Sequence, residues 1–158
     1  MKSISSKAKK TKIASRPKTK AKPDIAIEKS AATDVRRVLL VEDDPFISKA
    51  YAHYIARSGY AVDVALNVIE ARKKLAVRRP DIILLDIIMP GINGYEFLEE
   101  LKKKSAHKDV PVIMISNLSE QSAIARCKRL GAADYLVKSN LFMRDVIDKI
   151  QRQIVMGE

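Results

Sequence analysis

The chain is poor in several residue types, and each scarcity excludes a class of protein. It has 158 residues, no Trp and a single Cys, Cys127. One cysteine cannot form an intrachain disulfide, which argues against a disulfide-stapled secreted scaffold. No apolar run approaches the roughly 18 residues of a membrane span, and no apolar segment follows the charged N-terminus as in a secretory signal. We therefore expect a soluble, cytoplasmic protein.

Positive charge is concentrated at the N-terminus. Residues 1–33 contain ten Lys or Arg and two acids, so they carry +8 of the formal net charge of +11. They contain no aromatic residue, and such a composition cannot bury enough apolar surface to offset the entropy of ordering. We predict a disordered Lys-rich tail over residues 1–33 and a folded domain over residues 34–158.

Three roles for this tail stay open. It is a solvated extension, or it contacts an acidic partner, or it binds nucleic acid or another anionic surface through lysine–phosphate contacts. Because it has no aromatics for base stacking, nucleic-acid binding by the tail would be weak and independent of sequence.

From residue 35 onward, short apolar runs alternate with amphipathic stretches. The runs predict strands at 37–41, 60–65, 81–85, 110–115 and 133–137. The stretches predict helices from Pro45 to just before Gly59, and at 68–78, 94–104, 119–130 and 141–155, with Asn67 and Ser119 as caps. Near-continuous apolar strands that alternate with helices indicate an α/β fold, with a parallel sheet covered on both faces.

Polar residues follow four of these strands, at the carboxyl edge where such sheets form their sites. Glu42, Asp43 and Asp44 end the first strand, and Asp86, Ser116 and Lys138 follow the third, fourth and fifth. Closely spaced carboxylates favour a hard divalent cation such as Mg²⁺. An Asp beside such a cation can accept a phosphoryl group, which a lysine and a hydroxyl could bind. Asp44 is expected to serve only the start of the first helix.

In the stretches "VLLVEDDP", "DIILLDIIMPGINGYEFL", "PVIMIS" and "GAADYLVK", in this order, the sequence resembles a response regulator receiver domain of two-component signalling. The resemblance covers residues 36 to about 155. It implies a flavodoxin-like, five-stranded parallel sheet of order 2-1-3-4-5 with five helices. It also implies a chain that is not an enzyme in the turnover sense, although it assists its own phosphorylation.

By this resemblance, Asp86 accepts a phosphoryl group from a sensor histidine kinase or a phosphotransfer protein. Mg²⁺ is bound by Asp43, Asp86 and the backbone carbonyl of Ile88, with Glu42 acting through water. Ser116 and Lys138 bind the phosphoryl group, and Ser116 and Tyr135 form the switch. Since only three residues follow the last predicted helix, we expect a stand-alone receiver that signals to a downstream protein through a changed surface.

Four positions depart from the family pattern. Ser139 stands where the family usually has a proline after a cis bond, and a cis Lys138–Ser139 bond would cost about 2.5–4 kcal/mol. This predicts a trans bond with a shifted Lys138 loop, or a cis bond held at that cost. Asn117 stands where a smaller residue is usual and would narrow access to Asp86. Ile88, like Leu118, cannot orient a water, which predicts a long-lived aspartyl phosphate.

Other functions stay open at this point. A degenerate receiver would keep the fold as an interaction module that phosphate does not switch. An aspartyl-phosphate phosphatase would need a second acid two residues after the nucleophile, where Ile88 stands. A nucleic-acid-binding protein would work through its tail.

Overall fold

The computed structural model describes residue 3, residues 35–103 and residues 106–157. The predicted tail, residues 1–33, lies outside this part of the chain except for Ser3. Residues from Val35 onward belong to one compact unit. Its strands are β1 (Arg37–Val41), β2 (Ala61–Ala65), β3 (Ile82–Asp86), β4 (Val112–Ser116) and β5 (Asp134–Val137). Its helices are α1 (Pro45–Arg57), α2 (Val68–Val77), α3 (Gly94–Lys103), α4 (Gln121–Arg129) and α5 (Met143–Met156), with a short 3-10 turn, η1 (Lys138–Asn140), before α5.

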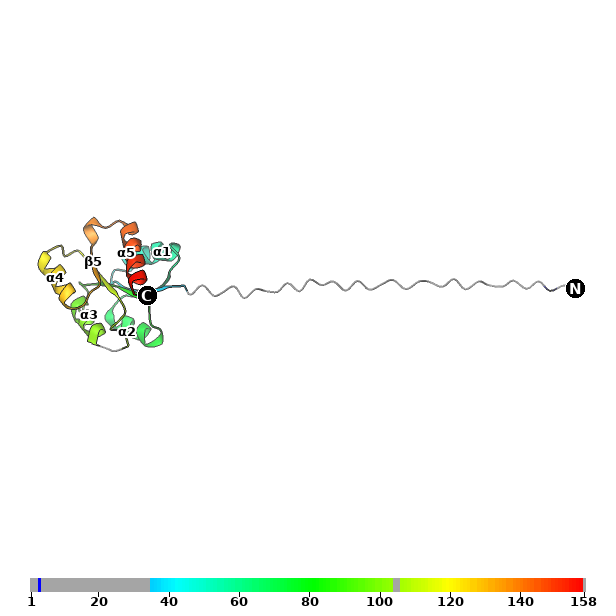
Figure 1. Cartoon of the computed structure of the whole chain (residues 1–158), viewed down its shortest axis with the longest axis horizontal. Coiled ribbons are helices and arrows are strands. Elements are labelled where there is room, and N and C mark those ends of the chain that lie inside the picture. The colour runs from blue at the N-terminus through cyan, green and yellow to red at the C-terminus, as the bar shows by residue number, and fades with distance from the viewer. Residues whose placement is uncertain (1–2, 4–34, 104–105, 158) are drawn as a thin grey trace. The chain divides into compact units, whose positions relative to one another are not determined.

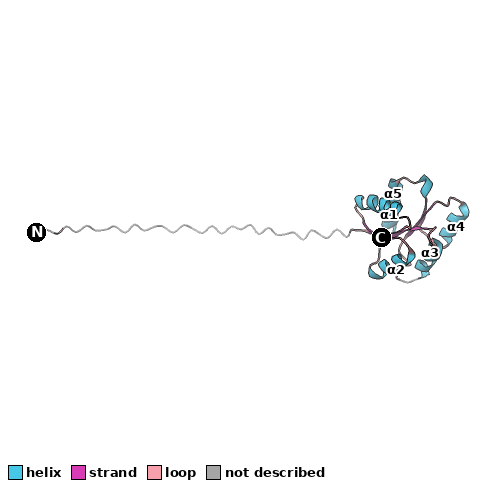
Figure 2. Ribbon diagram, turned by 180° about the vertical axis from the view of Figure 1, so that it is seen from behind, coloured by secondary structure: helices cyan, strands magenta, loops and turns pink. Residues whose placement is uncertain are grey.

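The five strands form one parallel sheet in the order β2-β1-β3-β4-β5. This confirms the fold and the strand order implied by the sequence. The helices surround the sheet, and the strands run between two helical layers (Figures 1 and 2). All five strand positions were predicted to within two residues.

Two separate cores hold the helices to the two faces of the sheet. One contains Leu75 of α2, Phe97 of α3 and Cys127 of α4, and the other contains Ile55 of α1 and Ile150 of α5. Every residue of β3 and β4 is buried, because helices cover both faces of these central strands. The edge strand β2 is mostly half-buried.

The start of α1 follows the sequence signals. The Asp44 carboxylate caps this helix by accepting hydrogen bonds from the backbone N–H groups of Phe46 and Ile47 at 2.8 and 3.0 Å. This confirms that Asp44 serves the helix start. Gly59 follows the helix in the left-handed region, with a φ of 94°.

The predicted cap of α4 is wrong. Glu120, not Ser119, occupies the N-cap position, and no side chain caps the helix. The cause lies just upstream, where the N–H of Leu118 bonds to the Ser116 hydroxyl and its carbonyl accepts from the Tyr135 hydroxyl. These bonds hold the loop outside the helix, so α4 begins at Gln121 rather than at residue 119.

In the part of the chain that the structure describes, no helix is both long and apolar enough to cross a membrane.

Candidate functional site

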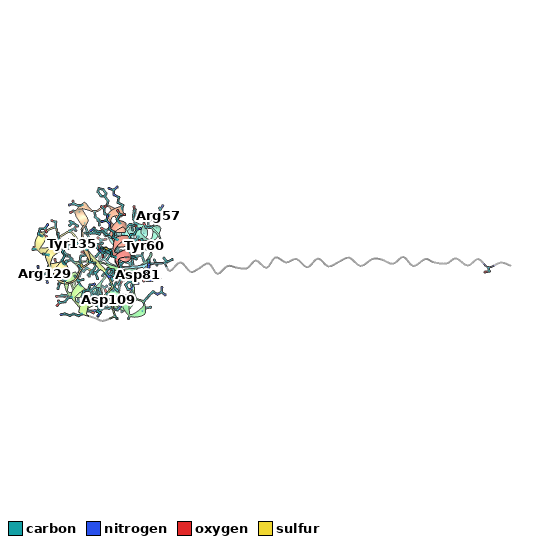
Figure 3. All side chains as sticks on the ribbon, in the orientation of Figure 1. Arg57, Tyr60, Asp81, Asp109, Arg129 and Tyr135 are labelled. Atoms are coloured by element: carbon teal, nitrogen blue, oxygen red, sulfur yellow. The ribbon has the colours of Figure 1, made fainter. Side chains whose placement is uncertain are left out.

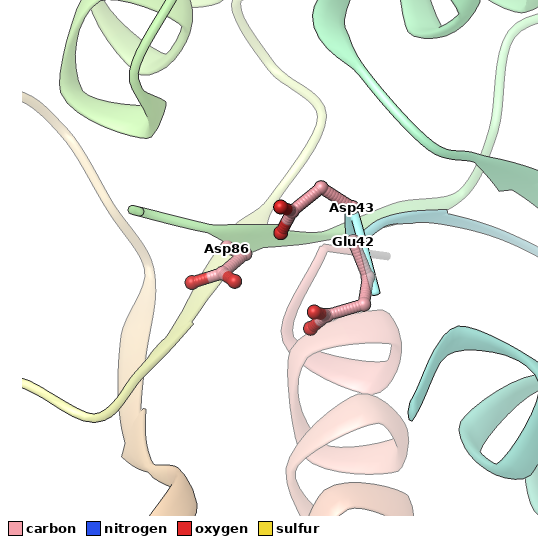
Figure 4. Close-up of side chains that lie close together, drawn as sticks. All are labelled: Glu42, Asp43 and Asp86. Carbon is pink, nitrogen blue, oxygen red and sulfur yellow. The ribbon is translucent and has the colours of Figure 1, made fainter. Parts of the chain in front are cut away.

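The carboxyl edge of the sheet brings together the polar residues predicted from the strand ends. Glu42 and Asp43 follow β1, while Asp86 ends the neighbouring strand β3. Ser116 ends β4, and Lys138 follows β5 directly. Figure 4 shows the side chains of Glu42, Asp43 and Asp86 gathered at this edge. The sheet therefore assembles the predicted constellation at one place.

The three acids form a compact cluster. One carboxylate oxygen from each of Glu42, Asp43 and Asp86 lies within 4.8 Å of the others. Glu42 and Asp86 are only 2% and 5% exposed, whereas Asp43 is half-buried. Negative charges that lie this close together with so little solvent around them repel each other strongly, so the cluster requires nearby cations.

Lys138 supplies one of these cations. Its Nζ lies 2.7 Å from Glu42 Oε2 and 2.7 Å from Asp86 Oδ2. The structure has no cis peptide bond among the described residues, so the Lys138–Ser139 bond is trans. Of the two arrangements that the sequence allowed, the trans bond is present, and the 3-10 turn η1 begins at Lys138 itself. The lysine reaches both acids without the cis bond that the family pattern implies.

Burial and pairing act in opposite directions on this pair of charges. Burial raises the pKa of Glu42, and the nearby Asp86 adds to this effect, while the hydrogen bond from Lys138 only partly offsets it. Burial lowers the pKa of Lys138, but its hydrogen bonds to Asp86 and Glu42 outweigh that effect and the net shift is upward. Lys138 therefore keeps its positive charge. The ionised form of Glu42 would be stabilised further by an additional cation.

The position of Asp86 depends on a close approach of the backbone at Gly94. The Gly94 N–H donates to the Ile87 carbonyl at 2.8 Å, which ties the start of α3 to the end of β3. A Cβ atom at position 94 would lie 2.2 Å from the Asp86 carbonyl oxygen. Only glycine fits there, which explains the second glycine of the "MPGING" stretch.

The two predicted switch residues meet at the backbone of Leu118. The fully buried Ser116 accepts the Leu118 N–H through its Oγ at 3.2 Å. The Tyr135 hydroxyl donates to the Leu118 carbonyl at 2.7 Å. Burial raises the pKa of Tyr135, whereas its interaction with Ser116 lowers it. The half-buried Tyr135 also packs against the core that contains Phe97 and Cys127.

The rim of the site carries the residues that depart from the family pattern. Ile88 is 58% exposed, and its backbone N–H donates to Asp86 Oδ1 at 3.2 Å. Asn117 is exposed and Leu118 is half-buried.

Tyr51 of α1 is a further neighbour of the site, which the sequence analysis did not single out. Burial raises its pKa, with further effects from Lys138, Glu42 and Asp86. The one sequence signal for Tyr51 is its place among apolar residues at helical spacing, which indicates packing and not a position near the site.

The donor set fits Mg²⁺. Magnesium prefers hard oxygen ligands, binds proteins through one or two carboxylates, and retains water. Three clustered carboxylates, one of them half-buried and open to water, match these requirements. Cys127 lies in a core cluster and His53 on the exposed surface of α1, so neither adds a softer ligand to this group.

Comparisons with known proteins agree with this geometry. The response regulator receiver domain family matches residues 38–151. The chain is 40% identical over 109 residues to the transcriptional regulatory protein MalR of Bacillus subtilis, covering 68% of this chain and 46% of that protein. It is 38% identical over 101 residues to the probable transcriptional regulator ycf29 of Porphyra purpurea, covering 64% and 48%. The chain therefore spans about half the length of these curated relatives.

Solved structures show the same fold. Chemotaxis protein CheY4 of Vibrio cholerae is similar with a TM-score of 0.71 and 29% identity, over 75% of this chain and 98% of that one. Response regulator protein TrrA of Thermotoga maritima, solved in complex with Mg(2+)-BeF, has a TM-score of 0.66 and 33% identity, over 75% and 99%. Fold, acid cluster and family match together show that this chain belongs to the response regulator receiver domain family.

Proposed function

We propose that this receiver domain accepts a phosphoryl group on Asp86, with Mg²⁺, and signals through a changed protein-binding surface. The donor is a phosphohistidine on a sensor histidine kinase or a phosphotransfer protein. The observation that carries this proposal is the position of Lys138 Nζ, 2.7 Å from both Glu42 and Asp86 in a cluster of three acids. A surface ion pair would not bring two nearly buried carboxylates to one lysine.

In the proposed reaction, a carboxylate oxygen of Asp86 attacks the phosphorus atom while the phosphorus–nitrogen bond to histidine breaks. The imidazole leaves with the electron pair of that bond, and Asp86 becomes an acyl phosphate. The Lys138 ammonium, already at Asp86 Oδ2, stabilises negative charge on the transferred group. The Ile88 N–H fixes the other carboxylate oxygen, so the nucleophile is oriented before the donor arrives.

We assign the metal ligands to the acid cluster. Asp43 and Asp86 would bind Mg²⁺ directly together with the Ile88 carbonyl, and Glu42 through water. When bound, Mg²⁺ neutralises phosphoryl oxygens and the acids that would repel them.

The switch that we propose runs through Leu118. When the Ser116 hydroxyl turns toward a phosphoryl group on Asp86, it gives up its bond from the Leu118 N–H. The same residue holds the Tyr135 hydroxyl through its carbonyl, so a shift of Leu118 also releases or moves the tyrosine. Phosphorylation would thereby bias the surface around β4, α4 and β5 between two arrangements.

Intact-mass spectrometry after incubation with acetyl phosphate tests the acceptor. The full chain and Asp86→Ala are compared with and without Mg²⁺. The expected result is a gain of one phosphoryl group that needs Mg²⁺ and is absent in the variant. No gain, under conditions that label a known receiver, would support the degenerate receiver instead and would direct attention to Ser139 and Asn117.

A further inference from the structure

A group of basic side chains lies on the edge of the sheet opposite Asp86. Arg37 begins β1, and α2 ends at Val77, so both lie at the amino edge. An open depression of about 440 Å³ is lined there by Arg37, Asp63, Lys73, Lys74, Val77 and Arg78. Arg79 follows in the chain and is exposed. We call Lys73, Lys74, Arg78 and Arg79 the α2 basic surface.

The described residues around this surface do not compensate its charges. Asp63, the one acid that lines the depression, is paired with Arg37 at 3.0 Å. Asp81 is likewise engaged, by the Arg36 guanidinium at 3.1 Å and by the backbone N–H of Arg37. Among the described residues, none of the four cations of the α2 basic surface has an ion-pair partner. Four unpaired cations within seven residues stand out in a domain of near-balanced charge.

Helix stability explains only part of this arrangement. A cation in the last turn of a helix offsets the negative end of the helix dipole, which accounts for Lys74. Arg78 and Arg79 lie beyond the end of α2, and Lys73 and both arginines are exposed. These side chains have no structural task within the described part of the chain and are free to bind an anion.

The shape and surroundings of the surface favour an extended polyanion. The cations are spread around an open depression and do not converge in a buried pocket, so a single small anion would be poorly held. In the sequence, residues 1–33 precede this domain and contain ten Lys or Arg. Basic N-terminal arms are typical of proteins that bind nucleic acid. A lipid surface is less suited, because that segment has none of the Trp, Phe or Leu residues that anchor interfacial segments.

We propose that the α2 basic surface binds the phosphate backbone of double-stranded nucleic acid without reading its sequence. No aromatic side chain lines the depression, so bases are not stacked, and the affinity comes from phosphate contacts and counterion release. Because this surface and the Asp86 site occupy opposite edges of the sheet, bound nucleic acid leaves the phosphorylation site accessible. The proposal does not depend on Asp86 being phosphorylated.

Fluorescence anisotropy of the full chain with two unrelated labelled duplexes, at salt concentrations from 50 to 200 mM, tests this surface. The test variant combines Lys73→Gln, Lys74→Gln, Arg78→Gln and Arg79→Gln. The control variant carries Gln at Lys49, Arg57, Lys128 and Arg129, which are exposed, also comprise two Lys and two Arg, and have no ion pair among the described residues. Figure 3 labels two of these control positions, Arg57 and Arg129. Circular dichroism verifies that both variants are folded.

Each phosphate contact contributes about 0.9 to the slope of log affinity against log salt. In the test variant, the magnitude of this slope is expected to fall by at least about 2. Its affinity for both duplexes at 100 mM salt is expected to fall at least about tenfold, while the control variant changes little. Equal losses in both variants would overturn the proposal, because bulk charge would then explain binding. Unchanged affinity in both variants would also overturn it, because binding would then belong to residues 1–33 alone. A loss confined to phosphatidylserine vesicles, tested in parallel, would replace nucleic acid with a lipid surface.

Discussion

Substituting Gly94 by Ala tests whether the contact between α3 and β3 positions the phosphoacceptor. The added Cβ would lie 2.2 Å from the Asp86 carbonyl oxygen and 2.7 Å from the Ile87 Cα, where ordinary contact begins near 3.4 Å. Both neighbours are backbone atoms, one in the last residue of β3 and one in the residue that follows it, and they cannot turn aside as a flexible side chain could. The first turn of α3 must therefore move away from the end of β3 by about 1 Å.

The size of the effect follows from two opposing terms. Overpacking of this kind typically costs about 1–3 kcal/mol, whereas Ala is favoured over Gly in a helix by at most about 1 kcal/mol. We expect Gly94→Ala to lower the free energy of unfolding by about 1–2 kcal/mol. Because a misplacement of about 1 Å can cost about 100-fold in rate, phosphorylation of Asp86 by acetyl phosphate should slow by up to that factor.

Urea unfolding followed by circular dichroism measures the stability, and intact-mass spectrometry measures the rate of phosphorylation. Gly157→Ala is the matched control, since its Cβ would make only ordinary contacts, 3.5 and 3.7 Å from carbonyl oxygens of α5. A Gly→Ala change at such a compatible site is neutral or stabilises by up to about 1 kcal/mol. If Gly94→Ala were as stable and as active as the wild type, the close approach would not hold Asp86 in place.

Three further outcomes are expected. Burial raises the pKa of Cys127 to about 11 from a usual value of 9.0. The folded state therefore favours the protonated thiol over the thiolate. The stability that the protonated Cys127 contributes is complete below about pH 8 and is lost as the pH rises from 9 to 11. Urea unfolding at each pH should show a smaller alkaline loss in Cys127→Ala, and equal losses would contradict the assignment. Lys138→Met should lower the free energy of unfolding in metal-free buffer by about 1–3 kcal/mol, because Glu42 and Asp86 lose their buried cation. Added Mg²⁺ should restore part of the lost stability. A urea midpoint equal to that of the wild type in metal-free buffer would refute the prediction. The aspartyl phosphate should be long-lived and should decay faster in Ile88→Asn, whose amide can orient a water; equal decay by mass spectrometry would show that position 88 does not control it.

Local patterns in the sequence determined most of the secondary structure. Short apolar runs indicated the five strands, most clearly β1, β3 and β4, because strands covered on both faces are nearly continuous in apolar residues. Asp44 and Gly59 marked the two ends of α1, since a cap and a left-handed turn depend on neighbouring residues alone. The prediction failed at Ser119, where bonds from Tyr135 and Ser116 to Leu118 delay the start of α4.

For the site too, the sequence determined some features and the tertiary structure decided the others. The sequence by itself determined which residue types follow each strand, and a parallel sheet sends all of these positions to one edge. Only the tertiary structure decided that Lys138 reaches Glu42, 96 positions earlier, through a trans bond. It alone revealed why position 94 must be glycine, and that the four cations of the α2 basic surface have no ion-pair partner within the described part of the chain. The physical reason is that these features depend on distances between segments remote in the chain, which strand register and packing set and local sequence does not encode.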